Sequence, residues 1–498
     1  MEHGNYINGR WQPSLSGRWF EDRNPADTRD CIGRFPLSSA EDVEAAVAAA
    51  KAAFARWRLL PAPRRGELLR RVGELLVERK EELARAMTRE MGKPLVEARG
   101  DVQEAIDTAF YAASEGRRLF GYTTPSELPN KVNLSFRMPV GVCGIITAWN
   151  FPIAVPSWKI FPALVCGNTV VWKPSEDAPH CANLLAQILA EAGIPAGVFN
   201  VVHGDAEAGE ALVRHPEVRL IAFTGSTAVG RRIAAICGEQ NKKCSLEMGG
   251  KNPLIVLPDA PMELALEGVL WGAFGTTGQR CTATSRLILH RDIAASFLQQ
   301  LIERASALRV GNGLEETTHV GPIINARQLE RIETYVQIGL QEGARLVLGG
   351  HRLIDGDYAH GYFFAPTIFT DVTPTMRIFR EEIFGPVLSV TTVDSLEEAI
   401  AVANDSEYGL SSSIYTRDIT AAFRAIRDLE AGITYINAPT IGAEAHMPFG
   451  GVKATGNGHR EGGWTVFDIF TEWKTVYIDY SGRLQRAQID TERLEDGA

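Results

Sequence analysis

Short runs of apolar and β-branched residues alternate with helical segments through the middle of the chain, and this alternation restricts the possible folds most. The runs VCGII, NTVVW, VFNVV and RLIAF begin at positions 142, 168, 198 and 219. Helical patterns separate them near 181–192, 206–214 and 228–238. Strands that alternate with helices pair in parallel through crossover connections, so we expect a parallel sheet with helices packed on it.

A second set of the same kind follows Gly250. Its strand-like runs are SRLILH, VLSVTTV and GITYIN, and its helices are expected near 291–307, 325–342 and 396–404. The chain of 498 residues is also too long for one ordinary hydrophobic core. The predicted fold class is therefore α/β with two sheet domains.

The first third of the chain is predicted to be helical. Ser38 and Glu41 resemble a capping box, and apolar residues then recur at helical spacing. A second helix is expected over 64–90, where a Gly-Lys-Pro sequence ends it, and a third continues to about Arg118.

The stretch 140–172 is long and apolar, but prolines at 152, 156 and 162 and several glycines interrupt it. A break in a lipid-exposed helix would leave backbone polar groups without partners. We therefore interpret this stretch as buried strands and loops of a large domain, not as a membrane span.

Charge and cysteine usage restrict the partners. The net charge of -10 argues against a nucleic acid or an anionic membrane. The seven cysteines form no CxxC pair, and the N-terminus lacks the features of a secretory signal. We expect reduced thiols in a cytoplasmic protein, and no bound metal.

Two strand-like segments lie outside both sheets. Residues 131–137 alternate apolar and polar side chains, and EWKTVYIDY at 472–480 has no local partner. Because an exposed strand edge favours pairing, 472–480 is predicted to complete a sheet in another subunit.

The usual phosphate-binding loops, GxGxxG and GxxxxGK[ST], are absent from the sequence. One segment, FTGSTAVG at 223–230, does follow a strand and lead into a helix. This would place Gly225 and Ser226 at a helix N-terminus, which favours a pyrophosphate. Such turns are common, so on this evidence alone a structural role is the better interpretation.

Cys281 and Glu247 are the candidates for acyl chemistry. Cys281 lies in a polar turn beside Arg280, which could favour the thiolate that attacks carbonyls, whereas the other six cysteines are interpreted as small buried side chains. Glu247 precedes paired glycines and could be a solvated charge. It would act as a general base only if a thioester is hydrolysed beside it.

Several motifs resemble those of the aldehyde dehydrogenase superfamily, in that family's order, from about Tyr6 to Tyr480. They are AWNFP with Asn150, WKPSE with Lys173 and Glu176, FTGSTAVG, LEMGGKNP, GQRCT, EEIFGPV with Glu382 and Phe384, and PFGGVKATG at 448–456.

The resemblance implies oxidation of an aldehyde to a carboxylic acid through a thiohemiacetal and a thioester on Cys281. Asn150 and the backbone N–H of Cys281 would hold the oxyanion, and Glu247 would activate the water that releases the acid. Lys173 joins them in the expected catalytic set. A branch that transfers the acyl group to coenzyme A, and a silent relative that only binds, remain alternatives.

The resemblance also implies a Rossmann-like site for a dinucleotide. A carboxylate at Glu176 accepts ribose hydroxyls and repels a 2′-phosphate, so NAD is preferred and NADP is possible. The expected cofactor residues are Ile146, Thr147, Trp149, Lys173, Ser175, Glu176, Gly209, Gly225, Ser226, Val229, Glu382 and Phe384.

The substrate is a small aldehyde. Arg280 could hold a substrate carboxylate, although it could equally form a structural ion pair. Glu444 and His446 lie where the family builds its substrate entrance, and the GAE sequence there is faintly similar to the aminoadipate-semialdehyde (antiquitin-like) branch. A carboxylated semialdehyde and a broad range of aliphatic or aromatic aldehydes both stay open.

The resemblance further implies three structural units and a homodimer or homotetramer. The cofactor domain is expected over 1–118 and 140–250, the catalytic domain over 251–464, and an oligomerisation element over 119–139 and 465–482. Residues 483–498 form a C-terminal tail of no assigned role.

Overall fold

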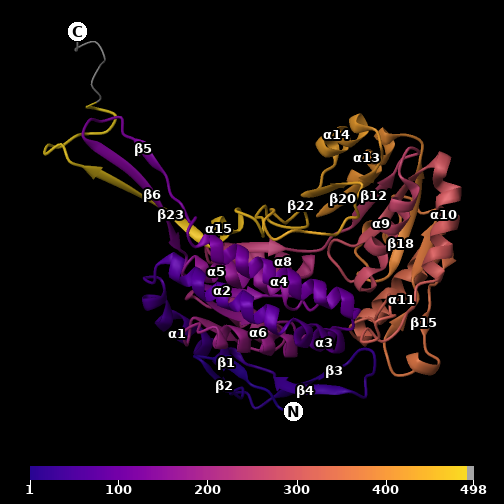
Figure 1. Ribbon diagram of the computed structural model, residues 1–498, viewed down its shortest axis with the longest axis horizontal. Helices are drawn as coiled ribbons and strands as arrows, with labels where there is room; N and C mark the ends of the chain where they lie inside the picture. Colours follow the sequence, from indigo (N-terminus) through magenta and orange to yellow (C-terminus); the bar gives the residue numbers. More distant parts are fainter. Residues whose placement is uncertain (491–498) are drawn as a thin grey trace, which may run out of the picture.

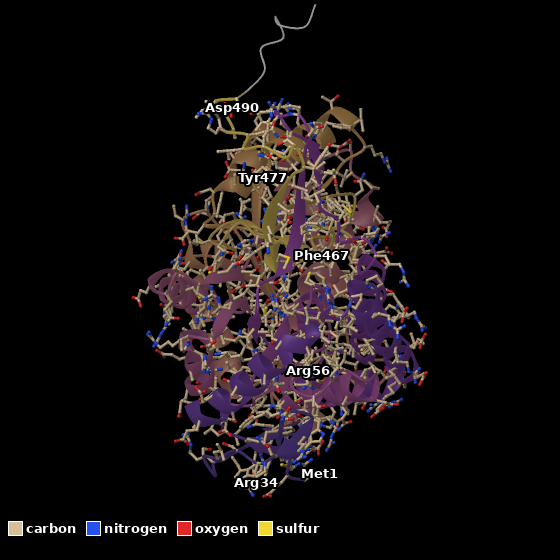
Figure 2. All side chains as sticks on the ribbon, turned by 90° about the vertical axis from the view of Figure 1, so that its left-hand side faces the viewer. Met1, Arg34, Arg56, Phe467, Tyr477 and Asp490 are labelled. Carbon is tan, nitrogen blue, oxygen red and sulfur yellow. The ribbon has the colours of Figure 1, made fainter. Side chains whose placement is uncertain are left out.

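The computed structural model describes residues 1–490 and contains two α/β bodies with an arm projecting from one of them (Figure 1). The arm, which carries Tyr477, points away from the end of the molecule where Met1 and Arg34 lie (Figure 2). The part of the tail from 491 to 498 falls outside the described residues. Among the described helices, none is long and apolar enough to cross a membrane.

The first body is built on a seven-stranded sheet. Five neighbouring strands are parallel, as predicted, and a short N-terminal hairpin adds two antiparallel strands at one edge. The strand order is β11 (Lys243–Glu247), β10 (Val218–Thr224), β7 (Val142–Ile146), β8 (Thr169–Lys173), β9 (Phe199–Val201), β1 (Asn5–Ile7) and β2 (Arg10–Gln12).

Eight helices belong to this body. They are α1 (Ala40–Trp57), α2 (Ala62–Glu78), α3 (Lys80–Met91), α4 (Leu95–Glu115), α5 (Ala154–Val165), α6 (Pro179–Glu191), α7 (Ala206–Arg214) and α8 (Thr227–Glu239).

Three local predictions for this body were wrong. The helix expected over 64–90 is two helices, because Arg79 leaves helical geometry at φ -104° and ψ 15°. The cap of α1 is one residue later than expected: Ser39 donates its backbone N–H to Asp42 at 3.0 Å. The stretch 140–172 contains a buried helix, α5, which accommodates Pro162 in its last turn.

The second body contains another seven-stranded sheet, again parallel except for one edge strand. The order is β14 (Arg345–Leu348), β17 (Thr367–Thr370), β18 (Val387–Val393), β13 (Thr284–His290), β12 (Asn252–Val256), β20 (Ser411–Tyr415) and β21 (Ile433–Ile436). Its main helices are α9 (Met262–Phe274), α10 (Arg291–Ser306), α11 (Ala326–Gln341), α13 (Leu396–Asn404) and α14 (Ile419–Asp428). The α/β fold class is thereby confirmed.

The arm is a three-stranded antiparallel sheet in the order β23 (Thr471–Asp479), β6 (Lys131–Pro139) and β5 (Thr123–Pro125). The segment 472–480 was expected to have no local partner, and β23 pairs with the distant strand β6 of its own chain along nine residues. The outer edge of β23 is not used within this sheet.

Short elements complete the described chain. They are β3 (Trp19–Arg23), β4 (Cys31–Pro36), η1 (Gly275–Gly278), β15 (Arg352–Leu353), η2 (Gly356–Tyr358), β16 (Phe363–Phe364), α12 (Arg377–Arg380), β19 (Tyr408–Gly409), β22 (Val452–Lys453) and α15 (Val466–Ile469).

Candidate active site

The carboxyl ends of the parallel strands in the first sheet carry several predicted site residues. Ile146 pairs with Lys173, and Thr224 pairs with Glu247. Strand order reverses beside β7, with β8 and β9 on one side and β10 and β11 on the other. Ligands of open α/β sheets bind outside the strands at such a reversal.

Cys281 lies between η1 and β13, in a loop with unusual backbone geometry. Thr276 and Thr277 have φ values of 50° and 59°, which side-chain-bearing residues rarely adopt. The carbonyl of Cys281 accepts a 2.8 Å hydrogen bond from the side-chain amide of Asn252. The loop therefore holds the cysteine in one place.

A cavity of about 440 Å³ lies over Cys281 and Glu247 and is lined mainly by apolar and aromatic side chains. Phe151 and Trp158 come from α5 and the loop before it, and Phe449 comes from the loop before β22. A largely apolar cavity with a thiol and several carboxyl groups in its wall suits a small organic substrate.

Burial, together with the nearby carboxyl groups of Glu382 and Glu247, raises the pKa of the Cys281 thiol to about 12. Arg280 does not act as expected: its guanidinium pairs with Glu97 and donates to Thr276 Oγ1 at 2.9 Å. The structural ion pair that the sequence left open is thus present. Because its pKa is raised, the Cys281 thiol is protonated at neutral pH.

Asn150 is buried in the loop after β7, where its exposed fraction is 4%. Its side-chain amide donates a 3.1 Å hydrogen bond to the carbonyl of Gln279, two residues before Cys281. This bond links the first body to the cysteine loop of the second.

Glu247 is the last residue of β11 and is not the solvated charge that an isolated motif would suggest. It is 3% exposed, and neither carboxylate oxygen has a hydrogen-bond partner among the described residues. Burial and the nearby Glu461 carboxylate raise its pKa well above the ordinary value, while Lys159 and Arg460 oppose that rise.

Sequence reasoning missed a buried ion pair next to Glu247. Lys159 on α5 pairs with Glu461, and the side chains are 0% and 3% exposed. The partners are 302 residues apart, so no local pattern could have shown them.

The N-terminus of α8 lies at the end of β10, as predicted for a phosphate site. Ser226 is its N-cap but makes no side-chain cap hydrogen bond, so the N–H groups of the first turn are available to a ligand. A Cβ at Gly225 would lie 2.5 Å from the Phe223 ring, which requires glycine there. These features fit a pyrophosphate.

The other predicted cofactor residues cluster around this strand edge. Lys173 and Glu176 form an ion pair of 3.2 Å. Gly209 on α7 faces the Lys173 side chain, and Val229 on α8 is 48% exposed. Residues Thr147 and Ser175 are buried, and Thr147 Oγ1 accepts a 2.9 Å hydrogen bond from Trp172 Nε1.

Two predicted residues approach from the second body. The ring of Phe384 packs edge-on against Trp149, with centroids 5.6 Å apart. Glu382 accepts a 3.0 Å hydrogen bond from the backbone N–H of Gly250, and a Cβ at Gly249 would lie 2.5 Å from its Oε2. The absence of a side chain at Gly249 therefore lets the Glu382 carboxylate approach the backbone this closely.

Glu444 and His446 do not belong to the described lining of the cavity. Their side chains are 69% and 59% exposed and lie 3.4 Å apart, whereas Ile441, Gly442 and Ala443 line the cavity instead. The residues of this loop that line the cavity thus precede the two predicted ones.

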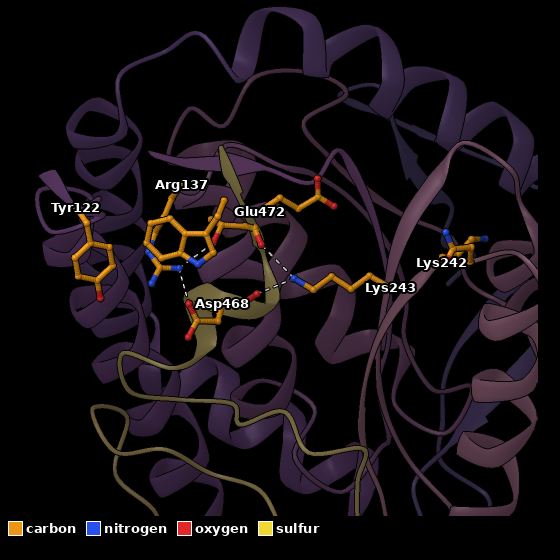
Figure 3. A pocket seen from close by; sticks show the side chains of 9 residues that line it. Tyr122, Arg137, Lys242, Lys243, Asp468 and Glu472 are labelled. Atoms are coloured by element: carbon orange, nitrogen blue, oxygen red, sulfur yellow. Dashed lines mark hydrogen bonds and ion pairs between the residues drawn. The ribbon is translucent and has the colours of Figure 1, made fainter. Parts of the chain in front are cut away.

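A second hollow, of about 820 Å³, lies at the base of the arm and contains none of the predicted site residues (Figure 3). Its charged groups are paired across the elements: Arg137 binds Asp468 at 2.6 Å, and Lys243 donates to the Asp468 carbonyl at 2.7 Å. These bonds join the arm to the first body.

Comparisons with known proteins find similar sequences along nearly the whole chain. The model described as the aldehyde dehydrogenase family matches residues 11–476. An α-ketoglutaric semialdehyde dehydrogenase of Bacillus subtilis is 45% identical over 95% of this chain and 97% of its own. An α-ketoglutarate semialdehyde dehydrogenase of Haloferax volcanii is 43% identical over 96% of this chain and 99% of its own.

Solved structures are similar along nearly the whole chain. An NAD-dependent aldehyde dehydrogenase from Sinorhizobium meliloti has a TM-score of 0.94 and 38% identity, covering 98% of this chain and 96% of its own. A betaine aldehyde dehydrogenase from Staphylococcus aureus in complex with NAD⁺ has a TM-score of 0.94 and 34% identity, covering 97% of this chain and 95% of its own.

The fold and the matches define an α/β oxidoreductase that acts on aldehydes. The chain belongs to the aldehyde dehydrogenase family. It is an NAD(P)-dependent enzyme that oxidises an aldehyde to a carboxylic acid through a thioester intermediate.

Proposed function

We propose that Cys281 carries the thioester and that Glu247 completes the reaction, because both line one cavity at the edge of the first sheet. Attack on the aldehyde needs the thiolate, and burial holds the proton on the thiol. Glu247 lies in the same wall, and neither of its carboxylate oxygens has a hydrogen-bond partner among the described residues, which supports a role in accepting the proton.

Asn150 supplies a donor for the oxyanion of the tetrahedral adduct. A side-chain amide has two N–H groups, and one is used by the Gln279 carbonyl. The second, together with the backbone N–H of Cys281, is available where negative charge develops on the former carbonyl oxygen.

The dinucleotide residues support NAD as the preferred acceptor, with NADP possible. Glu176 and Lys173 would hold the ribose hydroxyls, Gly225 and Ser226 the pyrophosphate, and Glu382 the second ribose. A bound dinucleotide supplies the hydride acceptor. The remaining proposed contacts are Ile146, Thr147, Trp149, Ser175, Gly209, Val229 and Phe384.

Hydrolysis of the thioester is assigned to water activated by Glu247, which is buried beside the cavity. The test is NAD-dependent oxidation of pentanal by the wild type, followed by mass spectrometry of Glu247→Gln mixed with pentanal and NAD. An acyl adduct on Cys281 supports the assignment. Rapid turnover of Glu247→Gln that requires coenzyme A would instead establish the acylating alternative.

A semialdehyde with a carboxylate at its far end is the proposed substrate class. Arg280 lines the cavity next to Cys281, and its Nη1 makes no hydrogen bond to a described residue. The relatives of Bacillus subtilis and Haloferax volcanii are named for such a compound, α-ketoglutarate semialdehyde. Glu444 and His446 are given no substrate role.

We further propose the division into a cofactor domain (1–118 and 140–250), a catalytic domain (251–464) and an oligomerisation arm (119–139 and 465–482). The outer edge of β23 and the exposed side chains of Tyr477, Ile478 and Tyr480 support a homo-oligomer held through the arm.

A further inference from the structure

Helix α4 presents three carboxyl groups to the substrate cavity at helical spacing. Glu97, Asp101 and Glu104 all line the cavity. Residues four and three positions apart lie on one face of a helix, so the three groups form a row along one wall.

Two of the three carboxyl groups are matched by cations. Glu97 pairs with Arg280. Asp101 pairs with Lys93 at 2.8 Å, both side chains being fully buried, and also accepts the backbone N–H of Ala154 at 2.7 Å. These two carboxylates are therefore fixed as structural partners.

Glu104 is different. No ion pair or hydrogen bond joins its carboxyl group to any described residue, although its side chain lies in the wall of a largely apolar cavity. Burial and the neighbouring Asp101 carboxylate raise the pKa of Glu104 to about 8.

The groups that face Glu104 come from several elements. On α4 itself, Asp101 and Asp107 raise its pKa, while Lys93 and Arg280 from neighbouring segments lower it. Burial raises the pKa of Tyr435 on β21, and the charges of Glu104, Glu444 and Cys281 contribute to that rise. Glu104 thus lies within electrostatic range of β21 as well as of its own helix.

We propose that Glu104 is a specificity-determining residue whose charge decides whether the distal end of the aldehyde can be a carboxylate. In its neutral form the carboxylic acid donates a hydrogen bond to the substrate carboxylate, beside Arg280. In its ionised form it repels that carboxylate across a cavity of low dielectric constant. The inference rests on the proposed function, because it takes this cavity as the aldehyde site.

The selectivity is expected to change with pH in one direction. As the pH rises from 7 to 9.5, Glu104 ionises and kcat/KM for a carboxylated aldehyde falls. A neutral aldehyde experiences every other titration of the active site but no repulsion, so the ratio of the two kcat/KM values isolates the effect of Glu104.

The experiment measures kcat/KM for 4-oxobutanoate and for pentanal with saturating NAD, at steps from pH 6.5 to 9.5. In the wild type the ratio of 4-oxobutanoate to pentanal should fall at least tenfold. In Glu104→Gln, which cannot ionise, the ratio should stay constant within a factor of two.

Asp107→Asn is the matched control, because it removes an exposed carboxylate from α4 outside the cavity lining. It should show a fall of the same size, moved to slightly lower pH because Asp107 helps to raise the pKa of Glu104. A flat ratio in the wild type, or the same fall in Glu104→Gln, would overturn the proposal. Failure to oxidise either aldehyde would instead contradict the proposed function of the cavity.

Discussion

The side-chain amide of Asn150 donates a 3.1 Å hydrogen bond to the carbonyl of Gln279 and so ties the first sheet to the loop that carries Cys281. We therefore propose two roles for Asn150: it orients the cysteine loop, and its second N–H binds the oxyanion. Removal of a single oxyanion donor typically slows acyl chemistry strongly.

We expect Asn150→Ala to lower kcat/KM for pentanal by about 100-fold to 1,000-fold. Pre-steady-state formation of NADH should slow by the same factor, since the adduct forms before the hydride is transferred. Asn252→Ala, which loses a bond to the same loop but no oxyanion donor, is the control. A loss below about threefold in Asn150→Ala would contradict the role, as typical donor effects are far larger.

Glu247 should control the release of the acid. Burial raises its pKa, and a general base acts only when ionised, so the deacylation rate should rise with pH beyond the range of an ordinary glutamate. Glu247→Gln should lower steady-state kcat by about 100-fold to 10,000-fold. Rapid-quench experiments on Glu247→Gln should show that the deacylation rate no longer depends on pH. A pH profile of deacylation equal to that of the wild type would contradict the role of Glu247.

The parts of this site that follow from chain order could be predicted from the sequence. Thr224 and Glu247 lie side by side because neighbouring parallel strands end at one sheet edge. The pair of Lys159 with Glu461 could not be predicted, because it joins residues 302 positions apart through tertiary packing alone.

The same limit applies to the arm and to the substrate cavity. The β6 and β23 strands were recognisable separately, but their nine-residue pairing depends on how the chain returns across the first body. Arg280 was identified by its position next to Cys281, whereas its partner Glu97 lies 183 residues away on α4. Local patterns therefore predict elements and their ends more readily than long-range ion pairs.

Cofactor choice should depend on Glu176. Its carboxylate, 3.2 Å from Lys173, would repel the 2′-phosphate of NADP. Glu176→Gln removes the charge and keeps the shape, so the ratio of kcat/KM with NADP to that with NAD should rise about tenfold, as expected for loss of roughly 1.4 kcal/mol of repulsion. Glu191→Gln, an exposed change at the end of α6, should leave the ratio unaltered. If the ratio of kcat/KM with NADP to that with NAD is the same in Glu176→Gln and Glu191→Gln, Glu176 does not determine cofactor choice.

The arm should hold the oligomer. Ile478 on β23 is 47% exposed in one subunit, and a charge there would have to be buried in the proposed interface. Ile478→Asp should therefore shift sedimentation toward smaller species at micromolar concentration. Val77→Asp on α2, where the native side chain is 53% exposed, provides the control and should sediment as the wild type does. A monomeric wild type would exclude the proposed assembly.

Acid stability should depend on His203, which is 1% exposed and has a pKa lowered by burial to about 3. Its Nε2 lies 2.7 Å from Asn183 Oδ1, and its Nδ1 has no hydrogen-bond partner within the described chain. Below the ordinary pKa of 6.5 the unfolded chain binds a proton that the folded state excludes. The stabilisation is therefore complete above that pH and is lost as the pH falls toward 3.

Between pH 7 and 4.5 this linkage should lower the free energy of unfolding by about 3 kcal/mol. The measurement is the urea midpoint of the cofactor-free protein across that range, for the wild type and for His203→Asn. The variant should lose stability at neutral pH but show a flatter dependence on acid, because asparagine takes up no proton. His351→Asn, at an exposed histidine, should retain the wild-type slope. Parallel slopes for wild type and His203→Asn would show that the acid sensitivity arises at other buried groups.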